Sequence, residues 1–335
     1  MTIGEFFARY GLFLVQLITV LVLLGLAALI VIVSARRGSM SPFGLQIEKL
    51  NERFENVRDV VNRAVLSKDA LKAERKRSKK AQKKTGARNR VYVIDFKGDL
   101  RASAATSLRE EVNAILGVAE DDDTVLVRLE NAGGTVHDHG FAASQLLRLK
   151  HHGIGLTVAV DKVAASGGYL MACVADRIIA APFAIIGSIG VLAQLPNFHR
   201  LLESKGIDFE QITAGRFKRT LTVFGENTEE GREKLKNELE DVHRLFKVQI
   251  SEHRPQVDIE SVATGEHWYG IRALELALVD EIKTSDDFLL EQIDRADVFR
   301  IEYRRRKSLQ ERLIGGAETL RMSLSSGEGG LESRH

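Results

Sequence analysis

Hydrophobic residues follow three different patterns along this chain. The first is an apolar run over residues 11–34, interrupted only by Gln16, Thr19 and the terminal Ser34. At about 1.5 Å per residue, a helix of this length crosses the roughly 30 Å hydrocarbon core of a bilayer. A cleaved signal peptide would have a shorter apolar region, of about 7–15 residues, before a small-residue cleavage site. The run therefore predicts an uncleaved membrane-spanning helix over 11–34, after an N-terminal flank over 1–10.

The second pattern is a heptad-like stripe within residues 45–66. Apolar residues recur there at alternating steps of three and four: Ile47, Leu50, Phe54, Val57, Val61 and Ala64. Such a stripe predicts an amphipathic helix that packs either on its own domain or on a second copy of the chain. Beside a membrane anchor we favour self-association. We expect residues 41–90 to form this juxtamembrane helix and a basic linker.

The basic linker is concentrated in residues 68–90, which contain no aromatic residue. Nucleic-acid binding surfaces usually interleave aromatic and basic side chains, so we do not expect a nucleic-acid partner. Anionic lipid head groups are the alternative partner for such a run.

The third pattern is an alternation of strand-like and helix-like segments from residue 91 onwards. We predict strands at 91–96, 124–129, 156–160 and 177–181, with helices at 103–116, from about 135 to 152, and directly after Ser166. This order predicts an α/β fold with a largely parallel sheet and helices on its faces. The apolar run 178–195 contains Pro182, Gly187 and Gly190, so it is interpreted as buried strand and loop and not as a second membrane span.

Two glycine turns fall at the carboxyl ends of predicted strands, where parallel sheets form their sites. Gly133 and Gly134 follow the second strand, and Ser166 is followed by Gly167 after the third. Taken alone, Ser166 would most often be a helix N-cap. Together, the turns could aim backbone N–H groups at an oxyanion formed next to a serine nucleophile. No GxGxxG or GxxxxGK[ST] pattern occurs near them, which argues against a phosphate site.

A serine nucleophile needs a base, and two kinds of residue qualify. His137 and His139 flank Asp138, so a histidine–aspartate partner is conceivable. Lys218 follows a strand-like segment at 209–213, and a lysine can accept a proton only when it is neutral, a state that burial favours. The histidines lack metal-ligand spacing, so we predict neither a metal nor a cofactor.

Composition adds limits to this picture. The chain has 335 residues, of which 44% are hydrophobic and 28% are charged, and its net charge is +2. This suits one large domain with appendages, which we place at 91–310. Residues 229–252 predict a long charged helix, and the Ser-, Gly- and Glu-rich residues 311–335 predict a disordered tail. The single cysteine, Cys173, lies among apolar residues, which predicts a buried packing role.

Five short motifs occur in a fixed order: ENAGG at 130–134, ASGGY at 165–169, GSIGV at 187–191, GRFKR at 215–219 and WYGIRALELALVD at 268–280. With the N-terminal anchor, they resemble the signal peptide peptidase A family of membrane serine peptidases, most closely its SohB-type members. The resemblance extends from the anchor to about residue 282.

The resemblance implies a spiral of ββα units of the crotonase and Clp protease type. It also implies that Ser166 is the nucleophile and Lys218 the general base, with backbone oxyanion donors at Gly133, Gly134 and Gly167. Whether Ser166 and Lys218 meet within one chain or across a subunit boundary stays open. One departure is Asn131-Ala132, where many members have Ser-Gly or Ser-Pro.

Further implications of the resemblance are a ring-shaped homo-oligomer and extended peptide substrates, such as signal-peptide remnants or misfolded membrane-protein segments. The expected location is the bacterial inner membrane, with a single span. Arg36, Arg37 and the basic linker favour a cytoplasmic body, whereas better-known relatives work on the other side. Two rival classes are a crotonase-like acyl-thioester enzyme, which would not need Ser166 or Lys218, and a catalytically silent membrane scaffold.

Overall fold

The computed structural model describes residues 11–25, 44–74, 76 and 88–304. Residues 11–25 are helical, and their side chains are exposed. Within the described ranges, no helix is both long enough and apolar enough to cross a membrane. The rest of the predicted span, residues 26–34, lies outside these ranges, as do the flank 1–10, most of the basic linker and the tail 311–335. Those predictions stay predictions.

The main compact unit, Ile47–Tyr303, is built on a seven-stranded sheet. Its strand order is β1 (Leu45–Lys49), β10 (Asp297–Tyr303), β2 (Arg90–Lys97), β3 (Thr124–Glu130), β4 (Gly155–Val160), β6 (Arg177–Ala180) and β9 (Glu281–Ile282). Every pair from β10 to β9 is parallel. The four predicted strands are confirmed, and their nearly continuous apolar sequences reflect a sheet that is buried on both faces.

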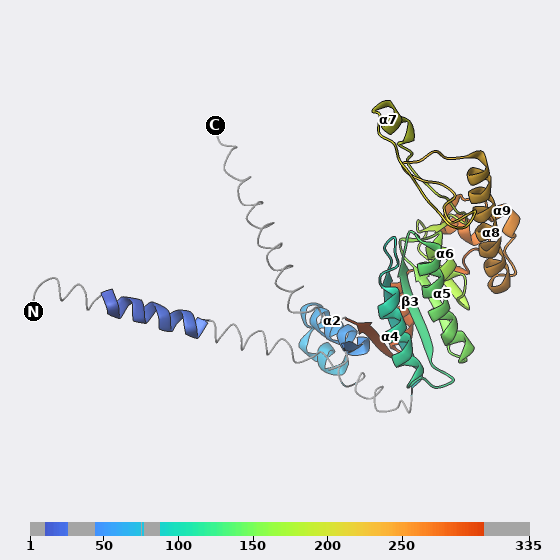
Figure 1. The fold of residues 1–335 in the computed structure, drawn as a ribbon. Coiled ribbons are helices and arrows are strands. Elements are labelled where there is room, and N and C mark those ends of the chain that lie inside the picture. Colours follow the sequence, from blue (N-terminus) through green and yellow to red (C-terminus); the bar gives the residue numbers. More distant parts are fainter. Residues whose placement is uncertain (1–10, 26–43, 75, 77–87, 305–335) are drawn as a thin grey trace, which may run out of the picture. The chain divides into compact units, whose positions relative to one another are not determined.

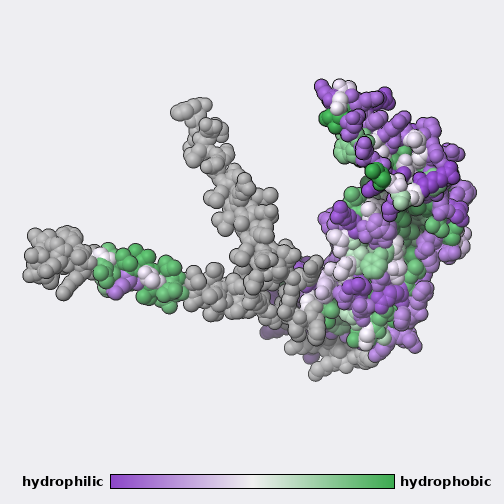
Figure 2. Space-filling model, viewed as in Figure 1, coloured by the Kyte–Doolittle hydropathy of each residue, from purple (hydrophilic) through white to green (hydrophobic). Residues whose placement is uncertain are grey.

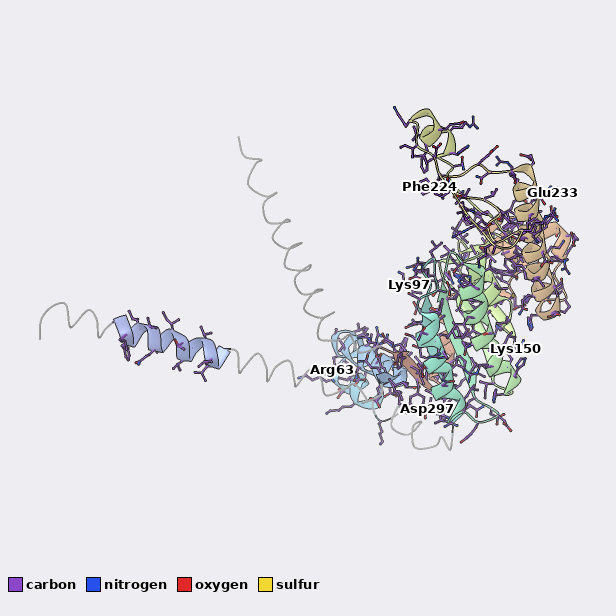
Figure 3. All side chains as sticks on the ribbon, viewed as in Figure 1. Arg63, Lys97, Lys150, Phe224, Glu233 and Asp297 are labelled. Atoms are coloured by element: carbon purple, nitrogen blue, oxygen red, sulfur yellow. The ribbon has the colours of Figure 1, made fainter. Side chains whose placement is uncertain are left out.

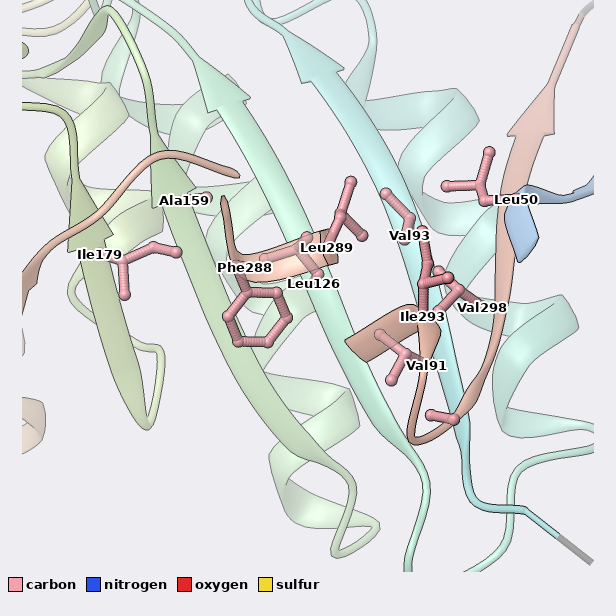
Figure 4. Packing of buried hydrophobic residues seen from close by; sticks show 11 residues of the cluster. Leu50, Val91, Val93, Leu126, Ala159, Ile179, Phe288, Leu289, Ile293 and Val298 are labelled. Atoms are coloured by element: carbon pink, nitrogen blue, oxygen red, sulfur yellow. The ribbon is translucent and has the colours of Figure 1, made fainter. Parts of the chain in front are cut away.

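Helices cover both faces of this sheet (Figure 1). On one face lie α4 (Ala105–Leu116) and α5 (Val136–His151), which pack on each other and on β2 and β4. On the other lie α11 (Ser285–Ile293) and the start of α2 (Leu50–Val65). Figure 4 shows Phe288 and Leu289 of α11 against strands that carry Leu126 and Ala159. The predicted α/β architecture is therefore confirmed.

Helix α2 packs on its own domain at its start, whereas Val57 and Val61 of the predicted stripe are exposed, so self-association stays a prediction. Its first residue, Leu50, is buried in the sheet's core, and Phe54 packs against the same cluster. The buried Asn51 amide donates to the Ile293 and Ala296 carbonyls, and its oxygen accepts the N–H of Val298. The stripe therefore packs on its own domain at this end, and the compact unit starts at Ile47.

A second sheet of three strands stands beside the first and carries the site. It contains β5 (Val163–Ala165), which is parallel to β7 (Ile185–Gly187), and β8 (His267–Tyr269), which is antiparallel to β7. A bridge from Asn131 to Ala164 joins the end of β3 to β5. Because α6 (Gly167–Ala172) starts directly after β5, the second sheet fixes where Ser166 stands.

The start of α6 is tied to the rest of the core by its aromatic residue. Tyr169 is fully buried and donates its hydroxyl to the Leu278 carbonyl at 2.9 Å, within the 268–280 motif. From the same motif, Asp280 accepts two hydrogen bonds from the buried Arg254 and one from the N–H of Ile178. Cys173 is buried as predicted, and burial raises the pKa of its thiol to about 12.

Residues 192–228 form an arm whose only helix is α7 (His199–Ser204) (Figure 1). The strand predicted at 209–213 does not form there. Within the arm, the Phe224 ring (Figure 3) lies 6.3 Å from that of Phe198 and 5.8 Å from that of Phe209. Asn197 donates to the Thr222 and Gly225 carbonyls, so the arm has internal order.

Three further helices follow the arm: α8 (Glu229–His253), α9 (Ile259–Val262) and α10 (Gly270–Glu275). Helix α8 confirms the long charged helix predicted at 229–252. Its apolar side chains are only partly buried, because Phe246 and Ile250 are buried whereas Leu245 is 55% exposed.

A buried carboxyl on α4 predicts a pH-dependent stability. Glu111 is buried, its Oε1 accepts the N–H of Tyr303 at 2.8 Å, and burial raises its pKa to about 7. Between its unfolded pKa of 4.5 and about 7, the folded state binds more protons than the unfolded state. Its contribution to stability is therefore complete below about pH 4.5 and is lost as pH rises through 7.

Glu111→Gln keeps an acceptor for Tyr303 and removes the ionisation. Thermal unfolding should show equal stability for the variant and wild type near pH 4.5, and a more stable variant at pH 8, by at most about 3 kcal/mol. Glu110→Gln, at the neighbouring half-exposed position, is the control and should show no such divergence. Parallel pH curves for Glu111→Gln and wild type would contradict the prediction.

Candidate active site

Ser166 has a backbone conformation that residues other than glycine rarely adopt. Its φ is 51° and its ψ is −120°, and it makes no side-chain cap hydrogen bond to α6. The N–H of Ser166 donates to the Gly187 carbonyl at 2.7 Å, and its carbonyl accepts the N–H of Leu170. Strain of this kind persists where surrounding contacts hold it, and it concentrates at functional sites. An ordinary N-cap role does not account for this geometry.

The Gly133–Gly134 turn lies directly against Ser166. A Cβ added to Gly133, whose φ is +91°, would stand 2.7 Å from the Ser166 Cβ and 2.9 Å from the Gly167 nitrogen. A Cβ on Gly134 would stand 2.0 Å from the Leu100 carbonyl oxygen. Only glycine fits at either place, so the two predicted glycine turns do meet at one site.

The three backbone N–H groups predicted as oxyanion donors are not equivalent. The N–H of Gly133 already donates to the Asn131 side-chain oxygen at 2.8 Å. Among the residues that the structure describes, the N–H groups of Gly134 and Gly167 have no hydrogen-bond acceptor. In this arrangement Gly133 is unavailable to a substrate, and two donors remain beside Ser166.

A mainly apolar cavity of about 300 Å³ adjoins the nucleophile. Ser166 and Gly167 form part of its wall, and the rest comes mainly from α5, α6 and α8. Its apolar side chains are those of Val136, Ala143, Leu147, Leu170, Val191, Val242, Leu245 and Phe246. A cavity of this kind suits one apolar side chain of a bound ligand. This wall was not predictable from the sequence, because α5 and α8 are far apart along the chain.

The end of β3 is fixed by a charged cluster directly before Asn131. Glu130 accepts from Lys162 at 3.1 Å and lies 3.2 Å from Lys97, which is labelled in Figure 3. These hydrogen bonds, the one from Lys162 first, hold the pKa of the Glu130 carboxyl below its usual range. The cluster stabilises the strand end from which the glycine turn departs.

The two histidines considered as bases contact residues other than Ser166. His139 is fully buried, and its ring nitrogens contact the Thr135 carbonyl at 2.8 Å and Asn131 Oδ1 at 3.2 Å. The His137 side chain is 82% exposed and lies 3.5 Å from Asp138. Over the described ranges, neither histidine is hydrogen-bonded to Ser166, and no cluster of three or more histidine, cysteine or acidic side chains could hold a metal ion.

Lys218 lies on the arm and is exposed. It ends a turn in which its N–H donates to the Gly215 carbonyl, and it is not among the residues that line the cavity at Ser166. Its neighbour Arg216 pairs with Glu230 and lies over the Phe217 ring. The burial predicted for Lys218 is therefore wrong for a single chain, because the arm does not fold over the cavity.

Comparisons with known proteins find similarity to one family of peptidases over most of the sequence. Residues 5–146 match the family model for the N-terminal region of peptidase family S49, and residues 148–298 match the model for peptidase family S49. A probable protease SohB of Haemophilus influenzae is 49% identical over 333 residues, covering 94% of each chain. A probable protease SohB of Buchnera aphidicola subsp. Schlechtendalia chinensis is 46% identical over 303 residues, covering 85% of this chain and 99% of the relative.

One solved structure that aligns with this chain is the 1510-N membrane-bound stomatin-specific protease, as a mutant bound to a substrate peptide. The TM-score is 0.43 at 14% sequence identity, over 68% of this chain and 97% of that one.

Proposed function

The chain belongs to peptidase family S49 as a SohB-type member, and from this we propose that it is a membrane-anchored serine endopeptidase with Ser166 as nucleophile. The observation that carries the proposal is the strained backbone of Ser166 beside two unpaired N–H groups. A serine nucleophile needs fixed backbone donors and access to its substrate, and Ser166 lines the cavity next to these donors.

The two donors define the oxyanion site. Gly134 and Gly167 donate to the carbonyl oxygen of the scissile peptide, which becomes negatively charged when Ser166 attacks. Donors that are already in place cost no reorganisation during the reaction, so they stabilise the transition state more than the bound substrate. Gly133 provides the turn geometry, since its own N–H is bound by Asn131.

We assign Lys218 as the base and place it in a neighbouring copy of the chain. In one chain it is exposed on an arm that also exposes large apolar residues, among them Leu192, Leu201, Ile207 and Ile212. Figure 2 shows green, hydrophobic patches among purple ones on this arm. Exposed apolar surface of this extent marks an interaction site. Docking of each arm on the next copy would bury both the apolar residues and Lys218, and it would close a ring of identical subunits.

The reaction then proceeds by acyl transfer. Neutral Lys218 takes the proton from the Ser166 hydroxyl, and the oxygen attacks the substrate carbonyl. The tetrahedral intermediate collapses to an ester on Ser166, and the protonated lysine gives its proton to the departing amine. Lys218, neutral again, removes a proton from a water molecule, whose oxygen attacks the ester. The protonated lysine then gives this proton to the departing Ser166 oxygen, which restores both residues and releases the acid product. No metal or cofactor takes part in these steps.

The architecture also fits the proposed crotonase and Clp protease type of spiral. Strands β4 and β5 followed by α6 make one strand–strand–helix unit, with the first strand in the large sheet and the second in the small sheet. Strands β6 and β7 repeat the passage from the large to the small sheet.

We propose that residues 11–34 anchor the enzyme in the bacterial inner membrane as a single span. The part that the structure describes, residues 11–25, is helical and exposes apolar side chains such as Leu12, Phe13 and Val15. A helix that is apolar on all sides needs an apolar environment. Arg36 and Arg37 after the span favour a cytoplasmic catalytic unit.

The expected substrates are extended peptides with an apolar residue next to the cut bond, such as signal-peptide remnants or segments of misfolded membrane proteins. The cavity of about 300 Å³ would receive this apolar side chain. The test is cleavage of casein and of peptides that differ only at that residue. Wild type should cleave after leucine in preference to aspartate. A wild type that cleaves no peptide would contradict the proposal.

Gly140 offers a matched pair of variants for the cavity. It lines the cavity, and a Cβ added to it would meet no atom within 4 Å. Gly140→Ala should therefore stabilise α5 slightly, by about 0.5–1 kcal/mol, and keep the wild-type preference. Gly140→Leu should fill the cavity and lower kcat/KM for leucine peptides by about 10–100-fold relative to alanine peptides. An unchanged preference in Gly140→Leu would show that the side chain binds elsewhere.

A further inference from the structure

A buried histidine lies between the two glycine turns, and the proposed reaction does not use it as a base. His139 is 0% exposed, and Asn131, which it contacts, is 1% exposed. Its Nδ1 lies 2.8 Å from the Thr135 carbonyl oxygen, and its Nε2 lies 3.2 Å from Asn131 Oδ1. Buried polar side chains are normally hydrogen-bonded, so the hydrogen-bond partners of His139 and Asn131 indicate what these two side chains do.

The orientation of the Asn131 amide is fixed by its neighbours. Its Oδ1 accepts the N–H of Gly133 at 2.8 Å, and its Nδ2 donates to the Met171 sulfur at 3.4 Å. Because a backbone N–H can only donate, the oxygen of the amide must face Gly133. The same oxygen faces His139, so this contact is a hydrogen bond only when Nε2 carries a proton. The Thr135 carbonyl can also only accept, so both ring contacts are hydrogen bonds together only when both ring nitrogens carry protons.

The imidazole also supports the turn that carries Ser166. A Cβ added to Gly167 would stand 2.5 Å from the His139 Cγ, and a Cβ added to Gly168 would stand 2.2 Å from the Asn131 carbonyl oxygen. The ring therefore packs on the residue whose N–H is one oxyanion donor. Through Asn131, it is hydrogen-bonded to the turn that carries the other.

We propose that His139 is a positioning residue, which donates from Nε2 to Asn131 Oδ1 and thereby fixes the distance between the Gly134 and Gly167 N–H groups. The inference rests on the proposed serine peptidase function. An oxyanion site stabilises the transition state more than the bound substrate, so a displaced donor lowers kcat and leaves KM nearly unchanged. A side chain that only stabilised the fold would instead change the folded fraction.

Two amide substitutions separate the contacts of the ring. His139→Gln places an N–H group near the position of Nε2, towards Asn131, whereas His139→Asn places one near Nδ1, towards Thr135. We expect Gln to keep kcat within about 3-fold of wild type, and Asn and Leu to lower it by about 10–100-fold, with KM within about 3-fold in each case. Kinetics are measured on the full chain with a leucine peptide, and rates are divided by the folded fraction.

A double variant tests the connection through Asn131. His139→Leu in an Asn131→Ala background should lower kcat no further than Asn131→Ala alone, because His139 reaches the Gly133 N–H only through Asn131 Oδ1 and leucine still packs on Gly167. Equal kcat values for His139→Gln and His139→Asn, or additive losses in the double variant, would overturn the positioning role while wild type still cleaves. A wild type without activity, or an active Ser166→Ala, would overturn the proposed function and this inference with it.

Discussion

Ser166→Ala should lower kcat/KM for peptide cleavage by about 10⁵-fold or more and leave the chain folded. The substitution removes the oxygen that forms the acyl-enzyme, and no other described hydroxyl stands in the same strained turn between β5 and α6. Substrate should still bind, because the cavity wall and the two backbone donors are unchanged. The rate is measured with wild type and variant at equal folded concentration, and KM should change little.

Glycine at position 166 distinguishes the loss of the hydroxyl from the effect of backbone strain. Ser166→Gly should be as inactive as Ser166→Ala, but more stable than it by about 1–3 kcal/mol, because glycine adopts a φ of 51° without steric cost. Ser261→Ala, an exposed serine whose hydroxyl donates to the Asp258 carbonyl, is the control and should retain full activity. Normal cleavage by Ser166→Ala would contradict the serine mechanism.

The sheet and its two glycine turns were predictable because short-range patterns determine them. Strands β2, β3 and β4 are buried on both faces, so their apolar runs identify them without knowledge of their neighbours. Gly133, Gly134 and Gly167 are placed where a Cβ would overlap other atoms, so their positions in the sequence mark the site. The strained φ of Ser166 follows from the same close contacts.

The arm and helix α2 were predicted less well, because their environments depend on distant parts of the chain or on other molecules. Leu50 is buried by α11 and β10, which follow it by more than two hundred residues. The roles of Asn131 and His139 could not be predicted from the sequence either. Asn131-Ala132 in place of Ser-Gly or Ser-Pro does not indicate that Asn131 accepts a buried hydrogen bond from Gly133. For Lys218, the sequence motif indicates the role of general base, but not whether the lysine acts on Ser166 of its own chain or of a neighbouring copy.

Lys218→Ala should lower kcat by about 10²–10⁴-fold, the usual contribution of a general base, with little change in the folded fraction because the side chain is exposed. Lys236→Ala, an exposed lysine on α8 paired with Glu240, is the control and should keep wild-type activity. The loss alone would not tell whether the lysine serves its own Ser166 or that of a neighbour, so the decisive measurement combines two inactive variants.

Ser166→Ala and Lys218→Ala subunits, mixed in equal amounts and co-assembled, should regain activity. In a ring where each site takes its serine from one copy and its lysine from the next, random assembly completes about a quarter of the sites, so about a quarter of the wild-type rate should return. A dyad formed within one chain would leave every subunit of the mixture with one catalytic residue missing, and the mixture would stay inactive. The exposed position of Lys218 on an arm with exposed apolar residues favours the first outcome. Mixing without co-assembly should restore nothing, since the two residues must then meet between separate rings.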